Sequence, residues 1–452
     1  MKTATIFKYF ALFLAITIMS CGGSDDDSGN GTGGGTDNTV TAINVSTINV
    51  DGTIGAGASG TVDVFVDQVL NFTVLDNLGN NVTSDVVVTI NGNTETLPYT
   101  FTTAGTYDVV ITYTNAAGDT FTTTYTVIVN PIPVPNSIIL SADVTSTFIG
   151  EDATFTVMDD LGNNISSLAT ITVAGNAITA NPYTFTAEGS FDVIATFTTT
   201  VPTTLTSNTV TITVVRPHVT KVMVEDFTGA WCGFCPRLAH KIDALAASNS
   251  KVIPLAIHNG DNMVFSGGPT LENNANISGW PTGKINKNMT WNETDAQVLA
   301  QLTPVKPLGL AIDSNIAGST LTVTAKVAFD LTVSGTHKLV VFVLEDGLIA
   351  NQTNYMNNDS SSPWYQAGNP IVGFVHDNVV RANLTNSVLG DVIPTAETIG
   401  GNEYSKDFTY TIPSGYNAAN LELVAFVVDA SGKAVNAQYV KAGQNQAFEL
   451  VP

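Results

Sequence analysis

Residues 225–242 read EDFTGAWCGFCPRLAHKI, and this stretch decides the fold of the C-terminal half of the chain. Cys232 and Cys235 are separated by two residues, and Pro236 follows them at a position that suits the first turn of a helix. Apolar residues then recur at helical spacing, which predicts an amphipathic helix over 235–248. The stretch therefore places a pair of cysteines at the N-terminal end of a helix.

Strands are predicted on both sides of this helix. The run TKVMVEDF before it alternates between two faces, and the run VIPLAIH after it, at 252–258, is apolar. The order strand, cysteine turn, helix, strand is the context in which a Cys-x-x-Cys motif predicts a thioredoxin-like fold. We expect a thioredoxin-like domain over 217–305.

The spacing of the cysteines suits thiol–disulfide chemistry. At a helix N-terminus, unpaired N–H groups favour the thiolate of Cys232, and Cys235, one turn later, can reach back to close a disulfide. Asp226 lies on the preceding strand, where a partly buried carboxylate would relay protons to Cys235. Two alternatives stay open: Asp226 is a solvated acid at the strand end, or Glu225 takes the role.

A second signal is the run ISGWPT at 277–282. It resembles the loop of thioredoxin folds whose cis-proline faces the disulfide and lines the substrate groove. In this chain that residue would be Pro281, with Trp280 packed nearby. There are two departures from an ordinary thioredoxin: Phe234 replaces the proline common between the cysteines, and 283–292 is polar and short for the usual two closing strands.

Zinc is the other common use of a Cys-x-x-Cys pair, and it needs about four ligands, usually from two such pairs. The chain has three cysteines, without a second pair, and five scattered histidines, so we predict no metal and no cofactor. His258 ends the second predicted strand and either tunes the cysteines or caps the strand. His240 is expected on the helix surface, and His376 and Arg381 are expected to serve loop packing.

The first residues of the chain carry a processing signal. Two lysines precede a short apolar core, FALFLAITIM, which is too short to span a bilayer. The run IMSC that ends at Cys21 resembles a bacterial lipobox, so we predict a signal peptide over 1–20 and a lipid on Cys21 that anchors the chain to a membrane. An ordinary secretory signal with a chance cysteine is the alternative.

The tract that follows is rich in Gly, Ser and Asp, and we expect a flexible tether over 21–39. Its acidic cluster, SDDD at 24–27, resembles the export signal that some Gram-negative lipoproteins use to reach the outer face of the outer membrane. A soluble linker explains the same residues. We expect an outer-membrane protein that faces the cell exterior, with the periplasmic face as the alternative.

The region after the tether repeats itself. FTVLDNLGNN at 72–81 returns as FTVMDDLGNN at 155–164, and PYTFTTAGTYDV returns as PYTFTAEGSFDV. Short alternating strands with Asp, Asn and Gly turns predict two Ig-like β-sandwiches, over 40–131 and 136–216. The acids of the two DxLGNN loops would bind calcium weakly or form turns, and the lack of alternating carboxylates favours turns.

The last third of the chain is again rich in strand-like runs, which predict a β-sandwich-like domain over 306–452 with a long irregular insert near 349–400. The expected fold class is multidomain: two all-β sandwiches, an α/β thioredoxin-like domain and a C-terminal β-domain. The chain has 39 acidic and 16 basic residues, a formal charge of −23. Such a surface repels phosphate backbones, so nucleic acid is not an expected partner.

Five runs of the C-terminal half together resemble one family, the outer-membrane-protein-28-related lipoproteins. They are VEDFTGAWCGFCP, PLAIHNGD, GWPT, FVHDNVVRA and LELVAFVVDASGKAVNAQYVKAG. The resemblance runs from 217 to the C-terminus and implies a thioredoxin-like domain followed by a β-domain on an outer-membrane lipoprotein. Matched onto this chain, the functional positions are Cys232, Cys235 and Pro281.

Two functions remain open. The first is thiol–disulfide exchange with protein substrates, in which Cys232 attacks, Cys235 resolves and Pro281 positions the substrate chain. The second is adhesion or binding of an extracellular ligand, with the disulfide as a permanent local feature. A disulfide that closes so small a loop constrains little of the unfolded chain, which favours the first function. A site outside the outer membrane with no evident electron donor favours the second.

Overall fold

The computed structural model describes residues 39–49, 53–55 and 60–452. The predicted signal peptide, the predicted lipid site at Cys21 and nearly all of the predicted tether lie outside the described residues. Two compact units divide the chain, one ending at Pro133 and the other beginning at Val134.

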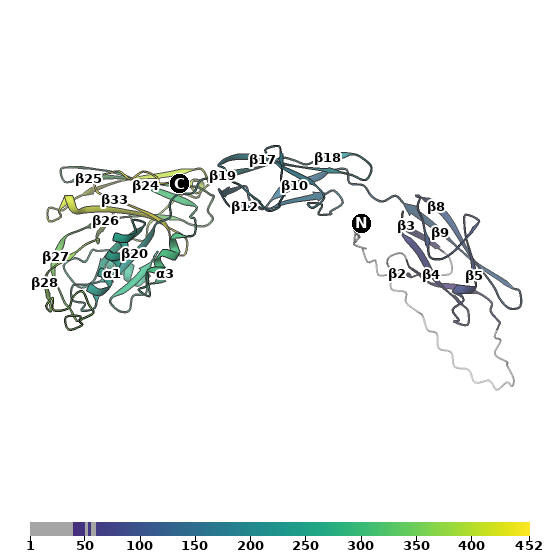
Figure 1. The fold of residues 1–452 in the computed structure, drawn as a ribbon, viewed down its shortest axis with the longest axis horizontal. Coiled ribbons are helices and arrows are strands. Elements are labelled where there is room, and N and C mark those ends of the chain that lie inside the picture. Colours follow the sequence, from purple (N-terminus) through teal and green to yellow (C-terminus); the bar gives the residue numbers. More distant parts are fainter. Residues whose placement is uncertain (1–38, 50–52, 56–59) are drawn as a thin grey trace, which may run out of the picture. The chain divides into compact units, whose positions relative to one another are not determined.

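The first unit is a sandwich of two sheets (Figure 1). One sheet has the strand order β2-β1-β4-β7 and the other the order β3-β9-β8-β5-β6. Alternate residues are buried, such as Val62 and Val64 of β3 and Val109 and Ile111 of β8, because side chains of a strand point to opposite faces in turn. The strands are β1 (Ile43–Asn49), β2 (Thr53–Gly55), β3 (Gly60–Phe65), β4 (Val69–Asp76), β5 (Val86–Ile90), β6 (Asn93–Glu95), β7 (Tyr99–Thr100), β8 (Gly105–Thr114) and β9 (Thr120–Asn130).

The second unit begins with another sandwich, in which the strands pair as β11-β19-β17-β14-β15, β10-β13 and β12-β16, with β18 beside β17. In both sandwiches the acid of the DxLGNN loop, Asp76 or Asp159, accepts two backbone hydrogen bonds from its own loop. This bonding agrees with the turn interpretation of those acids. The strands are β10 (Ile138–Ala142), β11 (Ser146–Phe148), β12 (Asp152–Ala153), β13 (Phe155–Asp159), β14 (Thr170–Val173), β15 (Asn176–Ala177), β16 (Tyr183–Thr184), β17 (Gly189–Thr198), β18 (Thr204–Thr206) and β19 (Val210–Val215).

The rest of the second unit is organised by one large sheet with the order β23-β22-β20-β21-β29-β26-β32-β33, in which β30 also pairs with β26. β20 runs parallel to β21 and antiparallel to β22, and Ala256 of β21 pairs in parallel with Val379 of β29. The sheet therefore crosses the boundary predicted at 305 and 306. Its strands are β20 (Val222–Thr228), β21 (Val252–His258), β22 (Thr282–Ile285), β23 (Met289–Thr290), β26 (Lys338–Glu345), β29 (Val379–Asn383), β30 (Asp391–Val392), β32 (Leu421–Val428) and β33 (Ala434–Lys441).

Two smaller sheets complete this region. The sheet β24-β25-β31 packs on one face of β26 and β32, and the hairpin β27-β28 stands apart from the large sheet. On the other face of the large sheet, apolar residues of β20 and β21 share a core with those of β26 and β32, such as Met223 with Phe342 and Phe426. The strands are β24 (Leu308–Ala317), β25 (Thr320–Phe329), β27 (Leu348–Gln352), β28 (Ile371–His376) and β31 (Glu403–Thr411).

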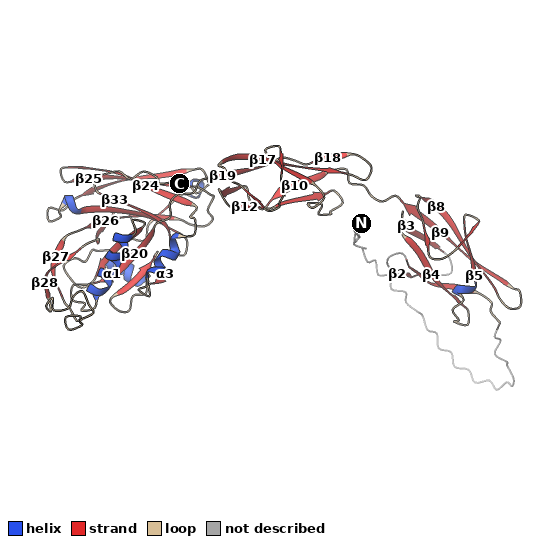
Figure 2. Ribbon diagram, in the orientation of Figure 1, coloured by secondary structure: helices blue, strands red, loops and turns tan. Residues whose placement is uncertain are grey.

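In the described residues three α-helices lie beside β20, and Figure 2 labels two of them, α1 and α3, in blue. They are α1 (Cys235–Ser248), α2 (Gly268–Asn274) and α3 (Asp295–Leu299). The helix predicted over 235–248 is confirmed, and its residues Leu238, Ile242 and Leu245 pack against Val222 and Val224 of β20. In the part of the chain that the structure describes, every helix is too short or too polar to cross a membrane.

Candidate redox site

The cysteine pair lies where β20 turns into α1. A disulfide joins Cys232 to Cys235 with their Cα atoms 5.4 Å apart. The backbone N–H of Cys235 donates to the carbonyl of Cys232 at 3.2 Å, which closes the turn, and Pro236 stands in the first turn of the helix. The Cys-x-x-Cys motif therefore has the structural context that the sequence predicts.

The loop that contains Pro281 lies next to this turn. The peptide bond between Trp280 and Pro281 is cis, as the resemblance to the thioredoxin-fold loop implies. The ring of Trp280 meets the ring of Trp231 edge-on at a centroid distance of 5.7 Å, and Trp231 directly precedes Cys232. Two short strands, β22 and β23, follow Pro281, so the polar run 283–292 does supply two closing strands.

Asp226 lies inside the protein on the α1 side of β20. Its side chain lines the same cavity as Cys235, and its Oδ1 atom has no hydrogen-bond partner. Burial, with the nearby charge of Asp243, raises the pKa of Asp226 to about 8. The sequence left open that Asp226 is a solvated acid at the end of the strand. The structure excludes this alternative, because the side chain of Asp226 is buried.

Glu225 points to the opposite face of the sheet. Its carboxylate is buried and pairs with the Nζ atom of Lys287 at 3.1 Å. Because successive side chains of a strand point to opposite faces, Glu225 cannot reach the cavity beside Cys235. Of the two acids, Asp226 is therefore the one whose side chain faces the cysteine helix.

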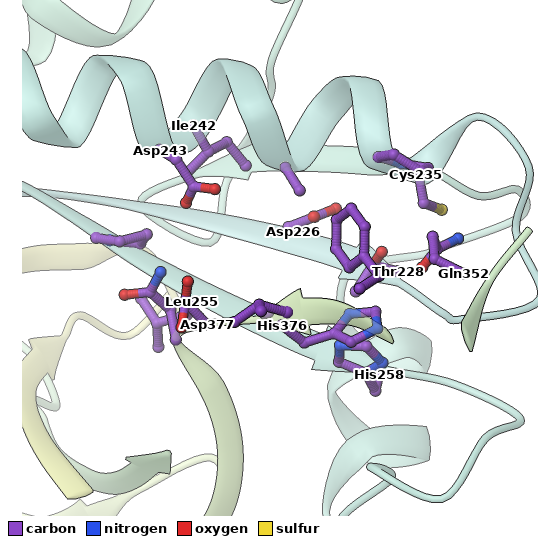
Figure 3. Close-up of a pocket in the computed structure, with 17 residues that line it drawn as sticks. Asp226, Thr228, Cys235, Ile242, Asp243, Leu255, His258, Gln352, His376 and Asp377 are labelled. Atoms are coloured by element: carbon purple, nitrogen blue, oxygen red, sulfur yellow. The ribbon is translucent and has the colours of Figure 1, made fainter. Parts of the chain in front are cut away.

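A cavity of about 50 Å³ lies behind Cys235, between α1, β20, β21 and the hairpin β27-β28 (Figure 3). The polar residues that line it are Asp226, Thr228, Cys235, Asp243, His258, Gln352, His376, Asp377 and Asn378. Figure 3 shows Cys235 and Gln352 at one end and Asp243 at the other, with Asp226 between them.

Two histidines form the wall of this cavity opposite α1. His258 is buried, and its Nδ1 atom lies 2.7 Å from Oδ2 of Asp261. The ring of His376 lies 5.1 Å from that of His258 and has an Nε2 atom without a partner. Burial, together with His258, lowers the pKa of His376 to about 4, so this imidazole is neutral near pH 7.

The remaining residues singled out in the sequence have structural contacts. His240 is exposed on α1, as expected, with Trp364 as an aromatic neighbour. Arg381 pairs with Glu345 at 3.2 Å and lies over the ring of Tyr416, which agrees with the expected packing role. Across the described residues, no three His, Cys, Asp or Glu side chains are grouped as a metal site would require.

A segment that we call the strap, residues 352–364, covers the cysteine turn. The Nε2 atom of Gln352 donates to the carbonyl of Cys232 at 2.8 Å, and the N–H of Tyr355 donates to the carbonyl of Gly233 at 2.9 Å. The Tyr355 ring lies so close to Gly233 that a Cβ atom there would be 2.3 Å from its Cγ atom. Under this cover Cys232 is only 4% exposed.

The strap, Asp243 and the place of His376 in the cavity were not predicted from the sequence. Asp243 had a signal, since it follows Pro236 and Ala239 at helical spacing, and all three line the cavity. The sequence gives no signal for the strap or for His376, because more than a hundred residues separate them from the cysteines. They lie in the insert that was expected to be irregular packing.

The fold and the site define a multidomain, mostly β protein with a disulfide-bearing helix in a mixed α/β region. Residues 269–446 match the family described as outer membrane protein Omp28, so the chain contains an Omp28 family domain. The matched range begins after the cysteine turn. Of the five runs that carried the resemblance, it includes GWPT, FVHDNVVRA and the closing run, but neither the cysteine run nor PLAIHNGD.

Solved structures give distant likenesses. HBP35 of Porphyromonas gingivalis is 16% identical over 53% of this chain and 81% of that one, with a TM-score of 0.42. Fibronectin(III)-like modules of Clostridium thermocellum CbhA are 14% identical over 37% of this chain and 92% of theirs, with a TM-score of 0.17. The Ig1-2 module of the Drosophila receptor tyrosine phosphatase DLAR is 10% identical over 39% of this chain and 100% of that one, with a TM-score of 0.13. Among curated proteins no match is found.

Proposed function

We propose that this chain is an outer-membrane lipoprotein, anchored by a lipid on Cys21, whose thioredoxin-like site exchanges thiols and disulfides with protein substrates outside the cell. The main support for the exchange activity is the position of Asp226, a buried acid in the cavity beside Cys235. A buried carboxyl group without a partner costs stability and contributes nothing to packing that an apolar side chain would not. Its position in the cavity beside Cys235 supplies a chemical reason for its presence.

The exchange has two steps in the direction that reduces a substrate. The Cys232 thiolate attacks one sulfur of a substrate disulfide and expels the other sulfur as a thiolate. The ionised form of Asp226 then takes the proton of Cys235, and the resulting thiolate attacks the Cys232 sulfur. A new Cys232–Cys235 bond forms, the mixed disulfide breaks, and its electron pair leaves with the substrate sulfur; the reverse sequence oxidises a substrate dithiol.

Asp226 is well matched to this proton transfer. Its pKa, raised to about 8 by burial, is close to the ordinary value of a cysteine thiol, about 8.5. A proton can therefore pass in either direction with little change in free energy, which is the condition for efficient general acid–base catalysis. Pro281, beside the turn, is assigned to positioning the substrate chain.

The test is the reduction potential of the Cys232–Cys235 pair, measured by equilibration in glutathione buffers with thiol trapping. A potential of roughly −120 to −270 mV, within the range of known oxidoreductases, is expected for an exchanging site. A Cys235→Ser variant should then hold substrates as mixed disulfides that the wild-type chain releases. A potential below about −300 mV would reject the exchange activity.

The second candidate is an adhesive or ligand-binding lipoprotein with a permanent disulfide. The observation in its favour is the strap, because Cys232 is 4% exposed beneath it. A very low potential combined with no mixed disulfide in the Cys235→Ser variant is the result this candidate expects.

The anchor and the exposed face have their own tests. A Cys21→Ala variant should lose metabolic labelling by a radioactive fatty acid and should no longer sediment with outer membranes. A protease added to intact cells should cut the wild-type chain if it faces the exterior. Protection until the outer membrane is opened would place the chain on the periplasmic face instead.

A further inference from the structure

The cavity behind Cys235 reaches from the disulfide towards the protein surface. At its inner end Cys235 is 1% exposed, and Asp226 is 4% exposed. At its other end Asp243 of α1 is an exposed residue, and Figure 3 shows its carboxylate turned towards the cavity. A volume of about 50 Å³ is enough for roughly three water molecules.

Two atoms of this cavity are buried and unpaired. They are Oδ1 of Asp226 and Nε2 of His376, in residues that are 4% and 7% exposed. Buried polar atoms in folded proteins are nearly always hydrogen-bonded to protein or to ordered water. The cavity that both side chains line is the place where water would serve them.

We propose that this cavity is a proton path, in which water held by His376 connects Asp226 to Asp243 and hence to solvent. Asp226 takes the proton that Cys235 loses when it attacks the mixed disulfide. The proton then moves through the cavity water to the Asp243 carboxylate, which releases it to bulk water. This inference rests on the proposed exchange activity and assigns to it two positioning residues, Asp243 and His376.

The need for such a path follows from burial. Once the ionised Asp226 has taken the proton of Cys235 it must lose that proton before the next turnover, and Asp226 is only 4% exposed. Asp243 is exposed to solvent, and partial desolvation of its carboxyl group, with Asp377 nearby, raises its pKa to about 6. Near pH 7 it is therefore mostly ionised and ready to accept a proton.

The charges around Asp226 favour its protonated form, so its proton passes to Asp243 against a difference in pKa. The titratable groups that line the cavity with it are Cys235 and Asp243 of α1, His258 of β21, and His376 and Asp377 at the end of β28. Outside the cavity, Asp346 and His240 act on Asp243, and Asp261 acts on His376. Among the described residues that line the cavity there is no lysine or arginine to hold Asp226 in its charged form.

The path predicts that a proton also crosses the cavity when no thiol is exchanged. The infrared band of the protonated Asp226 carboxyl, identified by its loss in Asp226→Asn, should shift quickly when the protein is transferred to D₂O. In Asp243→Asn and His376→Gln this shift should be slower by about tenfold, because general acid–base groups contribute at least that much to proton transfer. Asp295→Asn removes an equal charge from the exposed start of α3 and serves as the matched control.

The same variants are then compared in the resolving step. A mixed disulfide is formed on Cys232 with a short peptide thiol, and the release of that thiol by Cys235 is followed against pH. Asp243→Asn and His376→Gln should slow release near pH 7, and Asp295→Asn should match the wild type. Equal infrared exchange rates in all four proteins would overturn the path, even if thiol exchange occurs. A wild type that never releases the peptide but shows the infrared effect would overturn the exchange activity and leave the path standing.

Discussion

At the residue scale, Asp226 and Glu225 are neighbours on β20 with opposite environments. Both are buried and each has one unpaired carboxylate oxygen, but Glu225 also pairs with Lys287, whereas among the described residues Asp226 has no ion pair on the α1 face. Strand alternation alone separates them. Burial therefore acts on an ion pair in one case and on an isolated carboxyl group in the other.

The isolated carboxyl group predicts a pH-dependent stability. The pKa of Asp226 is about 8 in the folded protein and about 3.9 in an unfolded chain, so between these values only the folded state holds the proton. The free energy of unfolding therefore falls as the pH rises through this window. Asp226→Asn removes this pH dependence. The variant and the wild type should be equally stable near pH 4, and the variant should have the larger free energy of unfolding, by several kcal/mol, near pH 8.

Urea unfolding of both proteins across this pH range checks the prediction. Asp295→Asn is again the control, because Asp295 is exposed and should change little. An advantage of Asp226→Asn that stays constant with pH would contradict the raised pKa.

The buried ion pair between Glu225 and Lys287 predicts that removal of one partner lowers the stability of the protein. Lys287→Met leaves Glu225 charged and unpaired in the core, where its side chain is 0% exposed, and should cost about 3–5 kcal/mol. The double variant with Glu225→Leu should recover most of this loss, since it removes both charges. Thermal unfolding of the three proteins measures the effect, and a double variant as unstable as the single one would rule out the charge as the cause.

At the scale of elements, the strap sets access to the disulfide. Its contacts with the cysteine turn run through backbone carbonyls and through the Tyr355 ring on Gly233, which leaves no room for a larger residue there. The ring also meets Phe234 edge-on at 5.3 Å. Reaction at Cys232 therefore depends on how readily the strap moves.

Tyr355→Ala should increase the rate at which a small phosphine reduces the disulfide, by several-fold, because it removes the ring that covers Gly233. Tyr365→Ala is the matched control: this tyrosine lies just beyond the strap, and its hydroxyl bonds to Gln366 rather than to the cysteine turn. Free thiols counted over time with a chromogenic reagent give the rate. Equal rates for Tyr355→Ala and the wild type would show that the strap does not limit access.

At the scale of the whole molecule, the cysteine segment and the C-terminal β-strands share one sheet. β29 lies against β21, and apolar residues of β20, β21, β26 and β32 form a common core. At the start of the segment, Lys221 bonds to Gln438 and Glu449 near the C-terminus. These contacts bind together two regions that the sequence assigned to separate domains.

A fragment of residues 217–452 should therefore unfold in one cooperative thermal transition, whereas a fragment of 217–305 should not fold. The shorter fragment would expose the edge of β21 and the apolar face that contains Met223 and Phe227. Circular dichroism during heating distinguishes the two. A cooperative transition in the shorter fragment would support the predicted boundary at 305.

Local sequence patterns are sufficient to predict those elements and turns that depend only on residues close to them in the sequence. The alternation of β20, the helix after Cys235, the DxLGNN turns and the duplicated sandwich pattern all follow from periodicity and turn chemistry within a few tens of residues. Even the side of β20 on which Asp226 lies is contained in that alternation. The cis-proline at Pro281 was accessible only through resemblance, since most X-Pro bonds are trans.

Only the tertiary structure decided which distant residues complete the site. Gln352 and Tyr355 contact the cysteine turn, and His376 lines the cavity behind Cys235, because β29 joins the large sheet beside β21 and the hairpin β27-β28 lies across the cavity from α1. Strand pairing between segments more than a hundred residues apart leaves no periodic mark in either segment. The same long-range pairing creates the cavity, and with it the burial that changes the pKa values of Asp226 and His376.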